Sequence, residues 1–122
     1  MKNSYLAIFT LSALIAITSC NSEDPSIEGR WNIDSVTTQI DDVEISVITN
    51  KGWIEFKDDG AGEYEDGKTF SWDLSGKSLT MVGGRGARTF EVTTLKKKEM
   101  TFEITFLVLD KEAVERWKLS KI

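Results

Sequence analysis

From Ile27 onward, apolar and polar residues alternate in short runs that are rich in Val, Ile, Thr and aromatic side chains. Alternation with a period of two is typical of strands with one buried face, and no segment of useful length repeats with helical spacing. The only proline, Pro25, precedes these runs, so none of them loses a backbone donor. The pattern predicts an all-β domain with strands at about 30–38, 43–48, 53–57, 61–65, 68–74, 77–82, 88–95, 99–109 and 113–121.

Glycine turns such as Asp58-Asp59-Gly60, Asp66-Gly67 and Ser75-Gly76 connect several of these runs. Because such short links make neighbouring strands antiparallel, we expect an up-and-down meander that closes into a small barrel of about eight strands. Antiparallel closure needs an even number of strands, and the run at 43–48 is the weakest candidate: it is either a strand or a wandering connection. If it is a strand, the start of the domain and the loop at 83–88 should share one end of the barrel. If it is not, they should lie at opposite ends.

The two faces of the predicted strands differ in chemistry. One parity is apolar and includes Gly62, whereas the other carries acidic residues such as Glu55, Glu63 and Glu103, as a closed sheet with a dry interior requires. A barrel of eight strands is only wide enough to be filled by side chains or to hold one small ligand. Two interpretations stay open: a solid aromatic core, or a pocket for a small apolar or amphipathic compound. The aromatic residues predicted to point into the barrel are Trp31, Phe56, Tyr64, Phe70, Trp72, Phe90, Phe102, Phe106 and Trp117.

Several short motifs resemble those of the lipocalin-like domains of small bacterial lipoproteins, which are distant relatives of the lipocalins. Gly29-Arg30-Trp31 resembles the G-x-W of the first lipocalin strand, whose tryptophan closes one end of the barrel. Residues 56–62 resemble the F-x-x-D-G-x-G hairpin of the family, residues 72–79 its W-x-L-x-G-x-x-L hairpin, and residues 95–102 its last long pair. The resemblance implies a lipocalin-like barrel over residues 28–122. It also implies a cation of the last strand across the first-strand tryptophan, for which Arg116 is the candidate.

The first 20 residues have the features of an export signal. Lys2 precedes an apolar run from Tyr5 to Ala16 that is too short to span a bilayer, and Ile17-Thr18-Ser19-Cys20 follows. These four residues resemble the bacterial lipobox, which implies cleavage after residue 19 and acylation of Cys20, the only cysteine. We therefore expect a signal peptide at 1–19, an acylated tether at 20–27 and attachment to a membrane through lipid chains. The acidic residues after Cys20 resemble a surface-export signal, so the expected location is the outer membrane, either surface-exposed or facing the periplasm.

Composition limits the chemistry of the exported domain. The chain has no histidine and a net charge of −5, which becomes −6 when the signal peptide and its one lysine are removed. Without imidazole or a free thiol, the domain lacks the usual nucleophile pairs and zinc ligands; a carboxylate pair, lysine or tyrosine chemistry stays possible in principle, but we expect no enzyme and no cofactor. The acidic residues Asp58, Asp59, Glu63, Glu65 and Asp66 do not have the spacing of an EF-hand loop and are interpreted as turn residues and a solvated face, so we expect no metal site. Negative charge repels phosphates, so we expect no nucleic-acid partner.

The glycine-rich segment 82–88 lacks the ending of a phosphate loop and is interpreted as a mobile hairpin loop. Its Arg85 and Arg88 are candidates for binding an anion at the end of the barrel. Two functions remain for the domain. The first is a noncatalytic binding module for a small apolar or amphipathic ligand. The alternative is a structural or interaction protein with a solid core, such as an inhibitor, an adaptor or a complex subunit, that contacts a protein partner through its outer surface.

Overall fold

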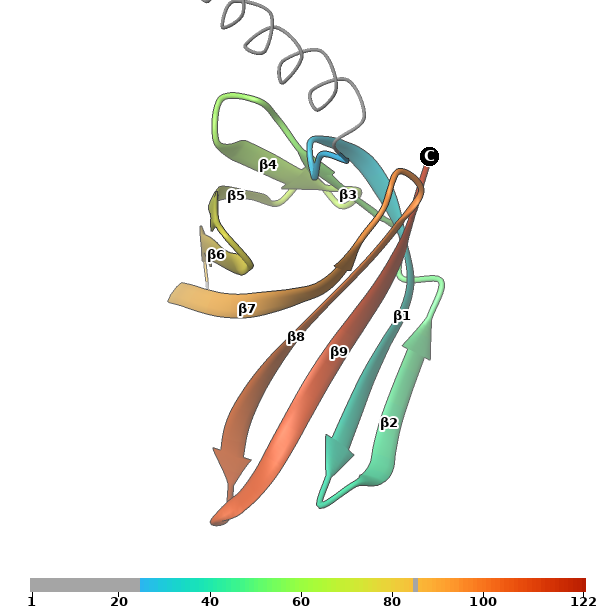
Figure 1. Cartoon of the computed structure of the whole chain (residues 1–122), viewed down its shortest axis with the longest axis vertical. Helices are drawn as coiled ribbons and strands as arrows, with labels where there is room; N and C mark the ends of the chain where they lie inside the picture. Colours follow the sequence, from blue (N-terminus) through green and yellow to red (C-terminus); the bar gives the residue numbers. More distant parts are fainter. Residues whose placement is uncertain (1–24, 85) are drawn as a thin grey trace, which may run out of the picture.

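Nine antiparallel strands form one continuous sheet in the computed structural model, which describes residues 25–84 and 86–122 (Figure 1). The predicted strands are confirmed, with ends that shift by at most two residues, and the described residues contain no helix. The strands are β1 (Gly29–Ile40), β2 (Val43–Thr49), β3 (Trp53–Phe56), β4 (Ala61–Tyr64), β5 (Thr69–Ser75), β6 (Ser78–Gly83), β7 (Gly86–Leu95), β8 (Glu99–Val108) and β9 (Lys111–Lys121).

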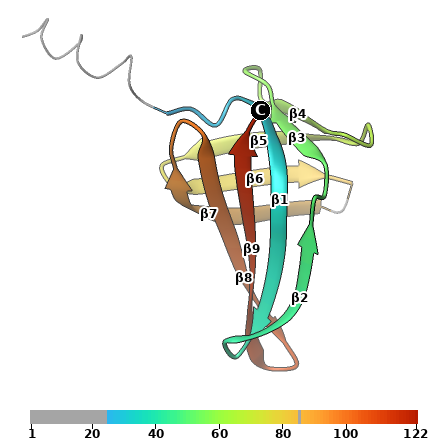
Figure 2. The ribbon, with the colours of Figure 1, turned by 90° about the vertical axis from the view of Figure 1, so that its right-hand side faces the viewer.

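The sheet closes because β1 pairs with β9 along most of its length, from Trp31 opposite Lys121 to Ile40 opposite Ala113. The order β1-β3-β4-β5-β6-β7-β8-β9 makes an eight-stranded barrel, as predicted, and β2 is an additional strand. Figure 2 shows β5, β6 and β7 running crosswise to β1 and β9. The core therefore lies between the long strands, such as β1 and β9, and the shorter crosswise strands β5, β6 and β7.

The run at 43–48 is a strand, and its place in the sheet resolves the odd number. Both β2 and β3 pair with the same edge of β1: β2 opposite residues 35–40 and β3 opposite residues 29–32. They therefore run in the same direction, one after the other, and together occupy a single position in the barrel. Asn50, with φ of 51°, and Gly52, with φ of 101°, lie in the connection between them. The expectation that a strand here would bring the loop at 83–88 to the start of the domain is therefore wrong, because no reversal of the chain separates β2 from β3.

Four strands continue beyond the barrel. We call this part the extension: residues 35–40 of β1, β2, residues 104–108 of β8, residues 111–116 of β9, and the turns at 41–42 and 109–110. The last residue of β8 that is paired with β7 is Glu103, so the remainder of β8 is paired only with β9. In Figure 1 these strands extend well past the crosswise strands β5, β6 and β7. The barrel interior thus ends partway along β1, β8 and β9.

Trp31 closes the end of the barrel from which β1 starts, which is the position that the G-x-W resemblance implies. Its side chain is fully buried, and its indole nitrogen donates a hydrogen bond to the carbonyl oxygen of Ile27 at 2.8 Å. Ile27 was expected in the tether but belongs to the core, with 3% of its surface exposed. The cation across Trp31 is Lys121, whose Nζ lies 4.5 Å from the ring centre and donates to the carbonyl of Glu28 at 2.7 Å.

Arg116 does not have the role that the family resemblance implied for it. Its Nε donates to Glu103 at 2.9 Å, in the pair of facing residues where β8 and β9 run side by side. Arg116 follows the opposite parity to Trp117, which is buried, so its side chain lies on the outer face of the sheet. The cation near Trp31 must come from the end of β9, because Trp31 pairs with Lys121 in the register of the two strands.

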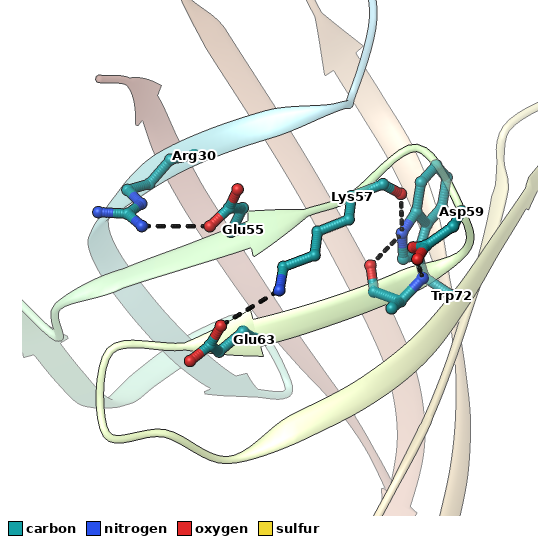
Figure 3. A network of polar contacts seen from close by, with 7 residues as sticks. Arg30, Glu55, Lys57, Asp59, Glu63 and Trp72 are labelled. Carbon is teal, nitrogen blue, oxygen red and sulfur yellow. Dashed lines mark hydrogen bonds and ion pairs between the residues drawn. The ribbon is translucent and has the colours of Figure 1, made fainter.

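The β3–β4 hairpin carries polar contacts on its outer face and a tryptophan at its turn (Figure 3). The ion pairs Arg30–Glu55 and Lys57–Glu63 measure 3.2 and 3.3 Å. Asp59 accepts a hydrogen bond from the backbone nitrogen of Ala61 at 2.9 Å, which is the turn chemistry expected of the acidic residues at 58–66. The indole nitrogen of Trp72 donates hydrogen bonds to the carbonyls of Lys57 and Ala61, at 3.0 and 2.8 Å. These two hydrogen bonds connect β5 to the β3–β4 turn.

Candidate functional site

A cavity of about 830 Å³ opens at the end of the barrel opposite Trp31. We call this opening the mouth: it lies between the connections at 50–52, 65–68 and 83–86. Its volume lies within the range of about 300–1,000 Å³ that is usual for small-molecule sites. The apolar side chains that line it are those of Ile33, Trp53, Phe70, Met81, Phe90 and Trp117, and the polar ones are those of Asn50, Lys51, Tyr64, Glu65, Asp66, Lys68, Thr69 and Arg88.

The structure separates the nine predicted inward aromatic residues into four groups. Tyr64, Phe70, Phe90 and Trp117 line the cavity. Trp31, Phe56 and Phe102 are fully buried and outside the cavity wall, whereas Trp72 fastens the β3–β4 turn. Phe106 was expected in the barrel interior, and this placement is wrong. It has the predicted parity, but it lies on the extension, where none of the described strands covers that face, and 36% of its surface is exposed.

Aromatic packing holds the cavity wall in place. Phe102 contacts both Phe90, with ring centres 4.9 Å apart, and Trp117, at 5.4 Å with nearly parallel rings. On the other side, Phe70 contacts Tyr64 with ring centres 5.1 Å apart. Because the rings behind the wall are buried, the lining side chains are fixed before any ligand arrives, which lowers the entropic cost of binding.

A carboxylate of β9 joins two of the lining residues. Glu115 accepts hydrogen bonds from Arg88 at 3.1 Å and from the indole nitrogen of Trp117 at 2.6 Å, and only 17% of its side chain is exposed. The guanidinium carbon of Arg88 also lies 5.0 Å from the centre of the Phe90 ring. Arg88 was predicted as an anion ligand. It lies at the cavity, but Glu115 balances its charge.

Glu115 was missed by the sequence reasoning, although one signal for it was present. It shares the inward parity of Ala113 and Trp117 on β9, and a charged residue on an otherwise apolar face needs a partner. Lys51 was missed as well. Its Nζ lies 4.9 Å from the centre of the Trp117 ring, at the mouth, and nothing in the local sequence indicates this contact.

Tyr64 places a phenol in the wall of the cavity, next to the ring of Phe70. Burial raises the pKa of Tyr64 above its ordinary value of 10.0, and the nearby carboxylates of Asp66 and Glu115 act in the same direction, while Arg88 opposes them. The phenol is therefore protonated at neutral pH. It can donate a hydrogen bond to a ligand without adding charge to the site.

Cys20 and Arg85, the predicted lipidation site and the second predicted anion ligand, lie outside the described residues. Within 25–84 and 86–122, no three carboxylate, imidazole or thiolate side chains come together as a metal site would need. The same residues contain no helix long and apolar enough to cross a bilayer.

Comparison with known proteins returned no match: no protein-family model, no curated protein and no solved structure is similar enough to this chain to be counted.

Proposed function

We propose that this protein is a membrane-anchored, noncatalytic lipocalin-like lipoprotein whose barrel binds one small amphipathic ligand. The observation that carries the proposal is the cavity of about 830 Å³ with an aromatic wall and a polar mouth. Burying apolar ligand surface on Phe70, Phe90 and Trp117 would supply most of the affinity. The phenol of Tyr64 and the cations Lys51 and Arg88 would orient a polar or anionic end of the ligand toward the mouth.

The anchor belongs to the same proposal. Acylation of Cys20 would hold the protein at the outer membrane, and the described chain begins beside the end that Trp31 closes. The mouth is at the other end of the barrel, so it would face away from the attachment point. Such a domain is suited to taking its ligand from the aqueous side rather than from the bilayer beneath it.

Two measurements on the full chain, purified in detergent, test this binding. Native mass spectrometry should show a copurified small molecule at one per chain. Anilinonaphthalene sulfonate, an anionic aromatic probe, should bind saturably with one site and gain fluorescence. Spectra that stay empty after incubation with lipid mixtures, together with no saturable binding of the probe, would refute the ligand-binding function.

Phe90 and Phe106 form a matched pair for locating the site, because both were predicted to point inward and only Phe90 lines the cavity. Phe90→Leu should weaken binding of the probe about five-fold, since it removes a ring contact that contributes on the order of 1 kcal/mol beyond its area. Phe106→Leu should leave binding unchanged. Equal effects of the two substitutions would place the probe outside the cavity.

A second candidate function is that of an interaction protein that acts through its outer surface. It is favoured by the exposed apolar side chains of the extension, which the barrel does not need for its own core. The two functions use different parts of the molecule and are compatible with each other.

A further inference from the structure

Exposed large apolar side chains are concentrated on the extension. Among the described residues, the large apolar side chains with substantial exposure lie on the extension, with the exceptions of Val82 and Ile122. A monomeric protein usually scatters such residues singly, whereas a cluster marks a contact surface. The set on the extension is Val43, Ile45, Val47, Ile48, Phe106, Leu107 and Leu109.

Three of these side chains, Val43, Ile48 and Phe106, lie in apolar rows across the sheet. In the register of the sheet, Val43 lies opposite Ile40, Ile40 opposite Ala113, and Ala113 opposite Phe106. This apolar row continues the inner face of the barrel beyond the point where the crosswise strands end. No strand of the described chain faces it, so its outer members, Val43 and Phe106, are exposed while Ala113 is buried.

β2 also has a free edge: no strand within residues 25–84 and 86–122 pairs with its outer side. It pairs with β1 on one side only, all seven of its residues are exposed, and Glu44 is its single charge. Edge strands normally carry lysine, proline or a cover that prevents pairing with another chain. β2 has only a register shift opposite Thr38 and Gln39. Its seven residues span about 23 Å, enough for one added strand.

The charge at the far end of the extension indicates which kind of partner could bind to the edge of β2. The turns and strand ends there carry five carboxylates and one lysine: Asp41, Asp42, Glu44, Asp110 and Glu112, with Lys111 3.9 Å from Asp41. A second copy of the chain carries the same net negative charge, and an anionic lipid surface would be repelled. A partner with lysine or arginine beside its apolar residues would be attracted.

We propose that the free edge of β2 binds an extended segment of a partner protein in which apolar side chains alternate and basic side chains flank them. The segment adds as a further strand: its backbone pairs with β2, and its apolar side chains lie beside Val43 and Ile48 and extend the inner rows of the extension. This deepens the second candidate function and rests on it, and it does not depend on the cavity. A single added strand is a small interface, so the complex is expected to be transient.

The test is a titration of the full chain in detergent with a labelled synthetic peptide, Lys-Val-Thr-Val-Lys-Ile-Thr-Val-Lys, followed by fluorescence anisotropy. Saturable binding is expected, with amide resonances of residues 43–49 shifting and affinity falling as salt is added. Two control peptides should not bind: one with Glu in place of every Lys, and one whose amide nitrogens are all methylated and cannot donate to a sheet edge.

Val47 and Val82 are a matched pair of exposed valines, with 47% and 45% of their surface accessible, on the extension and on the barrel. Val47 lies on the outer face of β2, where the lysines of the peptide would lie, so Val47→Lys should weaken peptide binding about ten-fold through charge repulsion. Val82→Lys, which adds the same charge elsewhere, should not. Glu44→Lys keeps the apolar edge and removes the attraction, so it should weaken binding mainly at low salt. Circular dichroism confirms that each variant is folded.

Several results would overturn the proposal. These are no saturable binding, equal binding of the Glu peptide, or an equal loss in the two valine variants. If the amides of residues 43–49 were protected from hydrogen exchange without peptide and sedimentation showed dimers, the occupant of the β2 edge would be a second copy of the chain. If they became protected only when anionic vesicles were added, the occupant would be a membrane surface. The probe titration of the cavity is a separate experiment, so failure of one leaves the other standing.

Discussion

Gly62 is the position where one added methyl group should disturb both the fold and the cavity. In the sheet it lies between Phe56 on β3 and Phe70 on β5, and its inward face is covered by the Phe70 ring. A Cβ at residue 62 would lie 2.1 Å from Cζ of Phe70, 2.3 Å from Cε2 and 2.6 Å from Cε1. Since carbon atoms pack at about 3.5–4.0 Å, the ring would have to retreat by about 1.5 Å.

The ring of Phe70 has little freedom to move. It is buried, and its centre lies 5.7 Å from that of Phe56 and 5.1 Å from that of Tyr64, so retreat breaks these contacts and pushes the ring into the cavity. Overpacking of this kind costs about 1–3 kcal/mol, while alanine is favoured over glycine in a strand by about 0.5–1 kcal/mol. Because three atoms of a buried ring clash, the cost lies in the upper half of its range, and we expect Gly62→Ala to lower the free energy of unfolding by about 1–2.5 kcal/mol.

Urea unfolding followed by tryptophan fluorescence measures this change as a lower midpoint with an unchanged slope. Gly84→Ala is the matched control, because a Cβ there meets no atom within 4 Å, and its stability should equal or slightly exceed that of the parent protein. The double variant Gly62→Ala, Phe70→Leu should lose less than the sum of the two single changes, since leucine lacks the clashing ring atoms. A Gly62→Ala midpoint equal to the parent value would refute the close contact of glycine and ring on which the reasoning rests.

Three further predictions concern single polar groups. Because burial raises the pKa of Tyr64 above 10.0, the tyrosinate absorbance that Tyr64→Phe removes should appear only above pH 10. The stability of the fold should decrease as the pH rises from 10 through that pKa, since the unfolded chain releases its proton first. Titration of Tyr64 at the ordinary pKa would contradict the burial. Asp59→Ala removes the acceptor for the backbone nitrogen of Ala61 and should cost about 0.5–1.5 kcal/mol in urea unfolding, whereas Asp59→Asn keeps an acceptor oxygen and should recover most of it. Glu115→Gln leaves the charge of Arg88 unbalanced, so anilinonaphthalene sulfonate should bind more tightly, and this gain should decrease as salt is added. The free energy of unfolding should fall by up to about 1 kcal/mol. Unchanged binding would show that the probe does not approach Arg88.

The strands and turns could be predicted from the sequence because their signals are local. Alternation in Ile54-Glu55-Phe56 or Phe102-Glu103-Ile104 depends only on the period of an extended chain, and Asp59-Gly60 specifies its turn within a few residues. The same parity rule identified several aromatic residues of the cavity wall, including Phe90 and Trp117. It could not separate these from Phe106, because parity states which face a side chain is on and not whether another strand covers that face.

The sequence by itself determined an all-β meander with an apolar inner face and an acidic outer one, and the side chains from which a cavity could be built. Tertiary structure decided where the barrel ends, that β2 and β3 share one edge of β1, and that Lys121 rather than Arg116 lies across Trp31. It also brought Arg88 to Glu115, 27 residues apart in the chain. The physical reason is that these features depend on register between strands distant in sequence, where a shift of one residue exchanges the two faces, and no local pattern specifies that register.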